Sequence, residues 1–512
     1  MKQVVILLLI FFFGSLLLGC NQEVSRQQKV SSRPNIIFIL TDDHRYDAMG
    51  FMGHPFLETP NMDRIAREGI YFRRAVVTTS LCSPSRASIL SGMYAHNHGV
   101  VNNYNPVDPG LKFFPEYLQE AGYITAFIGK WHMGGENDDP QRGFDYWLSF
   151  KGQGTYWADG HGTSRVVPQT SMDGYNINGK RVPQRGYITD ELTDYALAWL
   201  DNQSGEKPFF LYLSHKAVHS DFVAADRHIG KYKNEQLNYP VTFSIQKDKP
   251  MWLTNQRNSR HGVDFGYNLP DFDLNKYYQR YCETLLSVDE NLGRLIQWVE
   301  ESGHPGNTII VYMGDNGFQF GEQGLIDKRT AYEASIKVPL FIWWPGKLKK
   351  AMVIDEMVAN IDIAPTFLDI AGIPIPENID GRSFKPLMEG EKIDWRKELL
   401  YEYYWERNYP YTPTTHALIT DRYKFIRYQG IWDLDEFYDL QSDPEEITNL
   451  INAEQYQELI GNYRNSLFEL LEKTHGESIP LLPDKGQVYP LRNPEKSKSA
   501  NFPDSYFYKG GN

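Results

Sequence analysis

Four short apolar runs, each followed at once by polar residues, constrain the fold of this chain more than any other feature. The runs span Asn35–Leu40, Ile124–Ile128, Phe209–Leu213 and Thr308–Tyr312. Continuous apolar runs of this length are typical of strands buried on both faces, and helical patterns alternate with them. The alternation favours an α/β fold with a large, mostly parallel sheet between helices. Because the carboxyl ends of parallel strands share one edge, we expect the four polar clusters to meet there.

The polar clusters supply metal ligands and proton carriers. The oxygen ligands that follow the first and last runs are Asp42, Asp43, Asp315 and Asn316. This all-oxygen set suits Ca²⁺ or Mg²⁺, and Ca²⁺ is the better match for a crowded site. The cations and proton carriers nearby are Arg86, Lys130, His132 and His219. A divalent metal with bases around a nucleophile fits attack on a sulfate or phosphate ester.

Each cluster taken alone also fits a plainer structure. Two successive aspartates often cap a helix, and Asp-Asn-Gly often forms a turn. A single histidine is more often structural than catalytic. Their joint placement at the ends of four strands is what favours an active site.

A candidate nucleophile lies in the segment Ser80–Gly92, SLCSPSRASILSG. Ser83 as a cap and Pro84 as the first helical residue predict a helix start, and Gly92 predicts its end. Cys82 is then expected just outside a helix N-terminus, which favours an anion or an anionic nucleophile. Arg86 follows one turn later and can point back toward it. The segment alone leaves a packed thiol, a metal ligand and a nucleophile all open.

Composition and charge limit the remaining possibilities. The chain has 512 residues, enough for one large body and a smaller one, and a net charge of -13 that disfavours nucleic acid as a partner. Three cysteines are too few for a disulfide framework. Cys282 lies on the apolar stripe of a helix predicted over Lys276–Glu301, so we expect it to be a core residue.

The N-terminus has the pattern of an export signal. Lys2 precedes an apolar run over Val4–Leu18, and Leu17-Leu18-Gly19-Cys20 resembles a bacterial lipobox. The resemblance implies a lipoprotein signal peptide over 1–20, lipidation of Cys20 and a polar tether over 21–33. An exported bacterial lipoprotein of the outer membrane is therefore expected, on its periplasmic or its surface face. A plain signal peptide, giving a periplasmic or secreted protein, is the alternative.

The segment Cys82-Ser83-Pro84-Ser85-Arg86, continuing to Leu90-Ser91-Gly92, resembles the signature of type I sulfatases. The resemblance extends from Asn35 to about Leu450 and implies an alkaline-phosphatase-like fold. It also implies that a maturation enzyme oxidises Cys82 to formylglycine (3-oxoalanine), whose hydrate is the nucleophile. One Ca²⁺ ion would be held by Asp42, Asp43, Asp315 and Asn316, with residue 82 also facing the metal.

The same resemblance implies a role for each surrounding residue. Arg86 would hold the formylglycine, while Lys130 and Lys328 would clamp the sulfate oxygens. His132 would take a proton from the hydrate. His219 would protonate the leaving sugar oxygen, and His215 is the alternative acid or a partner in sulfate binding.

A narrower likeness suggests the substrate. Tyr94–Asn103 and Ile326–Arg329 look like motifs of N-acetylglucosamine-6-sulfatases and related bacterial polysaccharide sulfatases. They imply a sulfated glycan, with glycosaminoglycan, mucin and algal polysaccharide of the ulvan type all open. The loop candidates for sugar binding are Gln153, Gly154, Thr155, Tyr156, Trp252, Arg257, Arg260, His261 and His416. Ordinary loop packing explains each of them equally well.

The domain organisation predicted is a catalytic domain over 34–387, a C-terminal α+β subdomain over 388–475 and an extended tail over 476–512. Short aromatic-rich strands between Leu399 and Leu440 and an amphipathic helix over Ala453–Thr474 define the subdomain. They fit the small antiparallel sheet and helix that close sulfatases.

Two functions of other classes remain as alternatives. A phosphatase or phosphodiesterase of the same superfamily would use a Ser or Thr nucleophile and two transition metals. A non-catalytic glycan-binding lipoprotein would keep Cys82 as a thiol.

Overall fold

The structure is a computed structural model, and it describes residues 33–162, 173–259, 272–303, 305–407 and 409–480. The strands of its main sheet are β1 (Asn35–Thr41), β2 (Ile70–Phe72), β4 (Ile124–Gly129), β5 (Tyr146–Ser149), β6 (Tyr175–Ile177), β7 (Lys180–Val182), β8 (Phe209–Ser214), β9 (Thr308–Gly314), β12 (Leu340–Trp343) and β13 (Met352–Ile354). Within the described residues these ten strands run in the order β13-β2-β12-β9-β1-β8-β4-β5-β6-β7. The central strands β9-β1-β8-β4-β5 are all parallel, which confirms the predicted α/β sheet.

The four apolar runs are four neighbouring strands, β9, β1, β8 and β4. Their register aligns Thr41 with Gly314, and Ser214 with both Leu40 and Gly129. The carboxyl ends of these strands therefore lie level at one edge, as expected for a ligand-binding edge.

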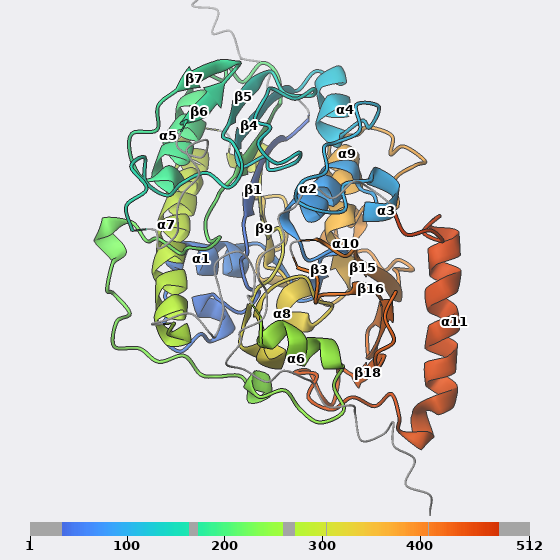
Figure 1. The fold of residues 1–512 in the computed structure, drawn as a ribbon. Helices are drawn as coiled ribbons and strands as arrows, with labels where there is room; N and C mark the ends of the chain where they lie inside the picture. Colours follow the sequence, from blue (N-terminus) through green and yellow to red (C-terminus); the bar gives the residue numbers. More distant parts are fainter. Residues whose placement is uncertain (1–32, 163–172, 260–271, 304, 408, 481–512) are drawn as a thin grey trace, which may run out of the picture.

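Helices cover both faces of the sheet (Figure 1). One face carries α2 (Cys82–Ser91), α4 (Phe114–Glu120) and α9 (Ile363–Ile370), and the other carries α1 (Pro60–Glu68), α5 (Ile188–Asp201) and α7 (Leu274–Glu301). Alternation along β1 explains the two cores, because Ile36 and Phe38 pack on one face while Ile37 and Ile39 pack on the other. Cys282 is fully buried in α7, which confirms it as a core residue.

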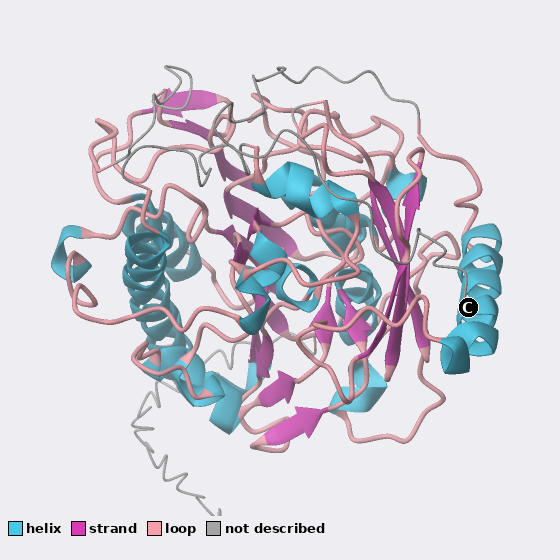
Figure 2. Ribbon diagram, turned by 60° about the horizontal axis from the view of Figure 1, so that its bottom comes forward, coloured by secondary structure: helices cyan, strands magenta, loops and turns pink. Residues whose placement is uncertain are grey.

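The C-terminal part of the described chain is a four-stranded antiparallel sheet with a helix on its outer side (Figure 2). Its elements are β15 (Glu398–Tyr403), β16 (Thr414–Thr420), β17 (Tyr423–Gln429), β18 (Glu436–Asp439) and α11 (Gln457–Lys473). The helix begins four residues later than predicted, because Glu454–Tyr456 forms a 3-10 turn first. Leu399, Phe425 and Leu467 belong to the same core as Phe38, so this sheet shares the hydrophobic core of the larger one.

The remaining short helices and strands lie in the segments between the elements given above. They are β3 (Ala75–Val76), α3 (Ala95–His98), α6 (Met251–Arg257), β10 (Gln319–Phe320), β11 (Ile326–Asp327), α8 (Glu333–Ile336), β14 (Val358–Ala359) and α10 (Lys385–Met388).

Several predictions fall outside the described residues. The signal peptide over 1–20 with Cys20, nearly all of the tether, the tail beyond residue 480, and the candidates Arg260 and His261 lie there. The boundaries 34–387 and 388–475 also stay predictions. Across the ranges that the structure describes, no helix has the length and apolarity needed to cross a membrane.

Candidate active site

The ends of β1 and β9 bring three carboxylates together. Oxygen atoms of Asp42, Asp43 and Asp315 lie within 4.8 Å of one another, and all three side chains are buried. The Asp43 backbone N–H donates to Asp315 Oδ1 at 3.0 Å, and Asn316 Nδ2 donates to Asp43 Oδ1 at 2.7 Å. The strand ends thus assemble the four predicted oxygen ligands into one cluster.

This cluster fits a hard divalent cation. Asp43 Oδ2 and Asn316 Oδ1 are buried oxygens with no hydrogen-bond partner, and such atoms are rare unless an ion or water binds them. Burial raises the pKa of Asp43 to about 7, and Asp42 and Asp315 add to the rise against the pull of Lys328. Burial and then Asp42 also raise the pKa of Asp315. Crowded carboxylates of this kind need a compensating positive charge, and an all-oxygen donor set suits Ca²⁺.

The helix that carries the cysteine begins earlier than the sequence predicts. Helix α2 starts at Cys82 itself, with the extended residue Leu81 as its N-cap, so Cys82 is not outside the helix and Ser83 is not the cap. Ser83 Oγ instead donates to the backbone oxygen of His132, a tertiary contact that no local pattern indicates. Gly92 ends the helix with a φ of 73°, as predicted.

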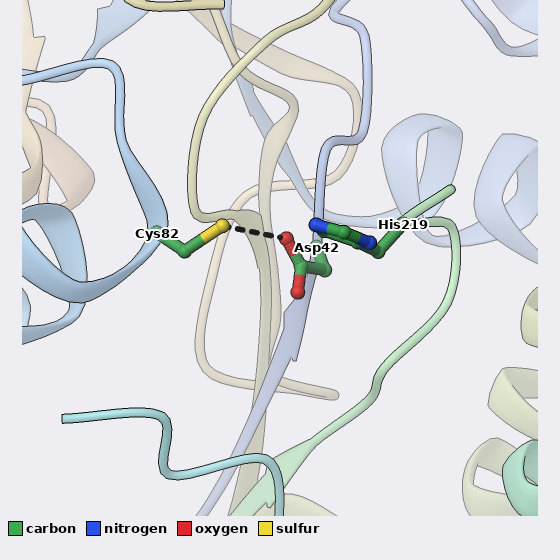
Figure 3. Close-up of side chains that lie close together, drawn as sticks. All are labelled: Asp42, Cys82 and His219. Carbon is green, nitrogen blue, oxygen red and sulfur yellow. Dashed lines mark hydrogen bonds between the residues drawn. The ribbon is translucent and has the colours of Figure 1, made fainter. Parts of the chain in front are cut away.

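Cys82 points into the carboxylate cluster. Its Sγ lies 3.3 Å from Asp42 Oδ1 (Figure 3). Lys328 Nζ also donates to Sγ, at 3.1 Å. The residue is fully buried, and burial, with Asp42 adding to it, raises the pKa of the thiol to about 12. The helix N-terminus therefore does not make Cys82 a thiolate, and the unmodified thiol is a poor nucleophile.

Arg86 donates hydrogen bonds to residues at the ends of three strands. Its Nε donates to Asp315 Oδ2 at 2.9 Å, and its Nη1 donates to the Lys130 carbonyl at 2.8 Å and to Ser214 Oγ at 2.6 Å. The guanidinium also lies 3.5 Å from Asp42, and its side chain is 2% exposed. Arg86 thus places a positive charge next to Asp42 and Asp315 in the cluster that Cys82 enters.

The two predicted sulfate-binding lysines both reach the cluster. Lys130 pairs with Asp42, and Lys328 pairs with Asp43. Lys130 follows Gly129, whose φ is 123° and where an added Cβ would lie 1.8 Å from the Ser214 carbonyl oxygen. Glycine at this position lets the end of β4 approach β8 closely enough for Lys130 to enter the site.

Gln153 contacts the catalytic residues directly. Lys130 Nζ donates to Gln153 Oε1 at 2.5 Å, and Gln153 Nε2 lies 3.0 Å from His132 Nε2. The sequence predicted Gln153 only as a possible sugar ligand. Burial, and then Lys130, hold the pKa of His132 well below its usual range, so this imidazole is neutral at neutral pH.

The two histidines after β8 have different charged groups around them. His219 Nε2 lies 3.9 Å from Asp43 Oδ2, and its Nδ1 donates to the Ser220 carbonyl at 2.7 Å. Burial and then Lys130 lower the pKa of His219, and an anionic sulfate ester beside it would oppose that shift. Burial lowers the pKa of His215 to about 4, and the charged group that acts on it is Asp190 of α5, on the opposite face of the sheet. The distance to Asp43 Oδ2 favours His219 as the acid, and sulfate binding by His215 stays a prediction.

The other sugar-binding candidates have packing partners. Tyr156 donates to the His219 carbonyl at 2.6 Å, and Trp252 is 4% exposed. Arg257 donates to the Phe243 carbonyl, and His416 is buried opposite Glu402 in the C-terminal sheet. Sugar binding by these residues stays a prediction.

The sequence motifs did not predict the contacts that Arg329 makes beside the site. Arg329 follows Lys328, has a φ of 74°, and donates through Nε to Glu406 Oε2 at 2.6 Å. Its guanidinium also lies 3.7 Å from the centre of the Tyr409 ring. Glu406 and Tyr409 belong to the loop after β15, and no spacing relates them to Lys328, so only the tertiary structure could find this contact.

Comparison with known proteins agrees with this geometry. Residues 34–373 match the family model of sulfatases, and residues 321–473 match the C-terminal model of N-sulphoglucosamine sulphohydrolase. The N-acetylglucosamine-6-O-sulfatase of Bacteroides thetaiotaomicron is 34% identical, with 90% of each chain covered. The N-acetylglucosamine-6-sulfatase of Homo sapiens is 32% identical, with 84% of each chain covered.

A solved structure of a protein in complex with its substrate D-glucosamine-2-N,6-O-disulfate has a TM-score of 0.78 and 32% identity. The structural match covers 87% of the present chain and 99% of the chain in that solved structure. The strand-end cluster, the cysteine at the start of α2 and these likenesses agree: the chain belongs to the sulfatase family and is a sulfuric ester hydrolase.

Proposed function

We propose that this protein removes sulfate from a sulfated glycan, using a formylglycine made from Cys82 and one Ca²⁺ ion. The observation that carries the proposal is the position of Cys82 Sγ, 3.3 Å from Asp42 Oδ1 and 3.1 Å from Lys328 Nζ. A modified side chain at this place would face both the metal ligands and a sulfate-binding cation. The high pKa of the thiol supports a modified residue rather than the cysteine itself as the nucleophile.

Asp42, Asp43, Asp315 and Asn316 would hold the Ca²⁺, which supplies positive charge for the oxygens of the sulfate group. As a hydrate, formylglycine supplies one hydroxyl to attack sulfur and a second whose deprotonation expels the sulfate.

The chain's own side chains bind the ester and move the protons. Lys130 and Lys328 bind sulfate oxygens, and Arg86 holds residue 82 in place. His132 accepts a proton from residue 82, and His219 donates one to the leaving oxygen of the sugar. The contact between Gln153 and His132 keeps the imidazole oriented for that transfer.

The proposed substrate is a 6-O-sulfated glucosamine or N-acetylglucosamine unit of a glycosaminoglycan or mucin glycan. This proposal rests on the two N-acetylglucosamine-6-sulfatases and on the substrate of the solved relative. An algal polysaccharide of the ulvan type is the alternative that a substrate panel has to separate.

We also propose that the protein is exported as a lipoprotein anchored through Cys20, in the outer membrane. The apolar run Val4–Leu18 and the sequence Leu17-Leu18-Gly19-Cys20 support the proposal. Labelling with a radioactive fatty acid should mark the natural chain and not Cys20→Ala. Equal labelling of both, or none, would contradict it.

The first experiment is peptide mass spectrometry on protein made in a host with a formylglycine-generating maturation enzyme. Formylglycine at position 82 of the tryptic peptide Ala75–Arg86, together with sulfate release from 6-sulfated N-acetylglucosamine, is the expected result. An unconverted Cys82 in a host that converts a control sulfatase would overturn the mechanism. Full conversion without release from any sugar of the panel would overturn the substrate.

A further inference from the structure

Two loops of the C-terminal sheet emerge at the same end and present large apolar side chains to solvent. Strand pairing sets Tyr403 opposite Thr415 and Thr414 opposite Gln429, so the loops after β15 and after β17 are neighbours. Trp405 on the first loop is 47% exposed, and Trp432 on the second is 66% exposed. Two large aromatic side chains, each about half exposed or more, are thus carried by loops at the same end of this sheet.

This end of the sheet is continuous with the sulfate site. Glu406, next to Trp405, accepts a hydrogen bond from Arg329, and Arg329 follows Lys328. Lys328 in turn contacts Cys82 Sγ. Few covalent and hydrogen-bonded steps therefore connect the exposed indole of Trp405 to the reacting centre.

Both loops are held in place by specific contacts. The Trp405 backbone N–H donates to Thr414 Oγ1 at 2.9 Å, and its indole N–H donates to the Pro410 carbonyl at 3.3 Å. The carboxylate of Asp433, beside Trp432, accepts the backbone N–H groups of Met251 and Trp252, each at 2.9 Å. The Trp405 indole and the backbone beside Trp432 are thus held in place, which lowers the entropic cost of binding a ligand there.

The charges around the indoles indicate what kind of ligand fits. The first loop carries Arg407, whereas the second carries Asp433 and Asp435, and Asp435 pairs with Arg427 at 3.0 Å. This mixture of signs indicates that the part of a glycan chain lying over the indoles is bound mainly by contacts other than ion pairs. Flat aromatic faces with polar groups at their edges suit the faces of sugar rings.

We propose that Trp405 and Trp432 form a platform that binds sugar rings adjacent to the sulfated sugar, so that the enzyme takes oligosaccharide or polysaccharide chains. This inference rests on the proposed function and deepens it. The sulfated sugar occupies the pocket around residue 82, and the chain attached to it extends over the two indoles.

The test compares a short and a long substrate on the matured enzyme. Trp405→Ala and Trp432→Ala should each raise KM about three- to tenfold for a tetrasaccharide that contains 6-sulfated N-acetylglucosamine. The value of kcat, and kcat/KM for the sulfated monosaccharide alone, should stay unchanged. Trp405→Phe and Trp432→Phe should recover most of the loss, and added NaCl should leave the ratio between variants unaltered because stacking is not ionic.

Tyr239 provides the matched control. It is 50% exposed, packs against Phe243 and belongs to neither loop. Tyr239→Ala should behave like the natural enzyme on both substrates. An equal change on the monosaccharide and the tetrasaccharide, or no change on either, would overturn the platform.

A binding measurement separates this inference from the proposed function. Calorimetric titration of the matured protein with the desulfated tetrasaccharide should show weaker binding by the two alanine variants. If the natural enzyme releases no sulfate from any substrate, the proposed function fails, and this titration still decides the platform. If sulfate is released but the alanine variants bind and turn over the tetrasaccharide normally, the platform alone fails.

Discussion

The carboxyl edge of the large sheet and the C-terminal sheet contribute to the same site in different ways. At the edge, Asp42, Lys130 and Asp315 follow strands directly, so each functional side chain lies within a few residues of an apolar run. The C-terminal sheet contributes through contacts between residues far apart in the chain, such as Arg329 with Glu406 and Glu333 with Lys424. The first region is specified by local sequence and the second by packing.

This difference suggests that residues at the edge carry out the reaction, whereas residues of the C-terminal sheet stabilise and position them. Changes at the edge should remove activity, because these residues are proposed to act on the substrate. Changes in the C-terminal sheet should reduce stability or shift the position of groups near residue 82. The predictions below test this division.

The largest effect is expected for Cys82→Ala. Loss of the nucleophile should reduce turnover about 10⁴-fold or more. The free energy of unfolding should change little, because the smaller side chain leaves the helix and its core intact. Sulfate release and thermal unfolding measure the two quantities, and a variant that unfolds instead would make Cys82 part of the supporting structure.

His219→Gln should come next, with turnover of a glycan substrate reduced about 10²- to 10⁴-fold. A nitrophenyl sulfate has a leaving group that needs no proton, so the reduction should be much smaller there. His215→Gln is the matched control and should keep near-normal turnover on both substrates. Equal losses in the two variants would show that the direction of the His215 side chain has been misjudged.

In the C-terminal sheet, Lys424→Met should lower the free energy of unfolding by about 3–5 kcal/mol. Lys424 Nζ donates to Glu333 at 2.7 Å and to Glu446 at 2.8 Å, so its removal leaves the buried Glu446 without its cation and Glu333 with Lys337 alone. Burial raises the pKa of Glu446, and Lys424 acts against that rise. In Lys424→Met the carboxyl of Glu446 should therefore become protonated more readily as the pH falls. Protonation removes the uncompensated charge, so the loss of stability should be smaller at acid pH.

The control for this buried pair is Lys385→Met at the surface. Lys385 pairs with Asp369 at 3.1 Å, and both side chains are about one-third exposed, at 31% and 32%. Its loss should cost less than about 1 kcal/mol. Denaturant unfolding of both variants compares them, and a similar cost for both would mean that the buried network adds no stability.

The smallest effect is expected for Glu406→Ala. Freed from Glu406, Arg329 should shift and move Lys328 with it, lowering kcat/KM for a small sulfate ester about tenfold. Glu406→Gln keeps an acceptor for Arg329 and should restore most of the activity. If the two variants lose activity equally, the charge of Glu406 matters and its hydrogen bond does not.

Sequence patterns predicted the edge because strand burial and polar residues at strand ends are both local signals. They placed the three aspartates, Lys130 and His219 near one another without any knowledge of long-range contacts. The start of α2 was wrong because Ser83 makes a tertiary contact with His132 instead of capping the helix. Side chains alternate between the two faces of the sheet along β8, so His215 is expected on the opposite face from Ser214. Gln153 and Glu406 could not be placed, because only the folded chain brings them to Lys130 and Arg329.

The burial of Cys82 bears on whether the residue is oxidised before or after the chain folds. The thiol is fully buried at the first turn of α2, where Asp42 and Lys328 contact it, so a maturation enzyme that has to hold the chain around residue 82 could not do so after folding. Its conversion to formylglycine, as proposed, is therefore expected to precede folding. A chain that folds with Cys82 unconverted would lack the proposed nucleophile, so the active fraction of a preparation would record how the oxidation of Cys82 competed with folding of the sheet edge.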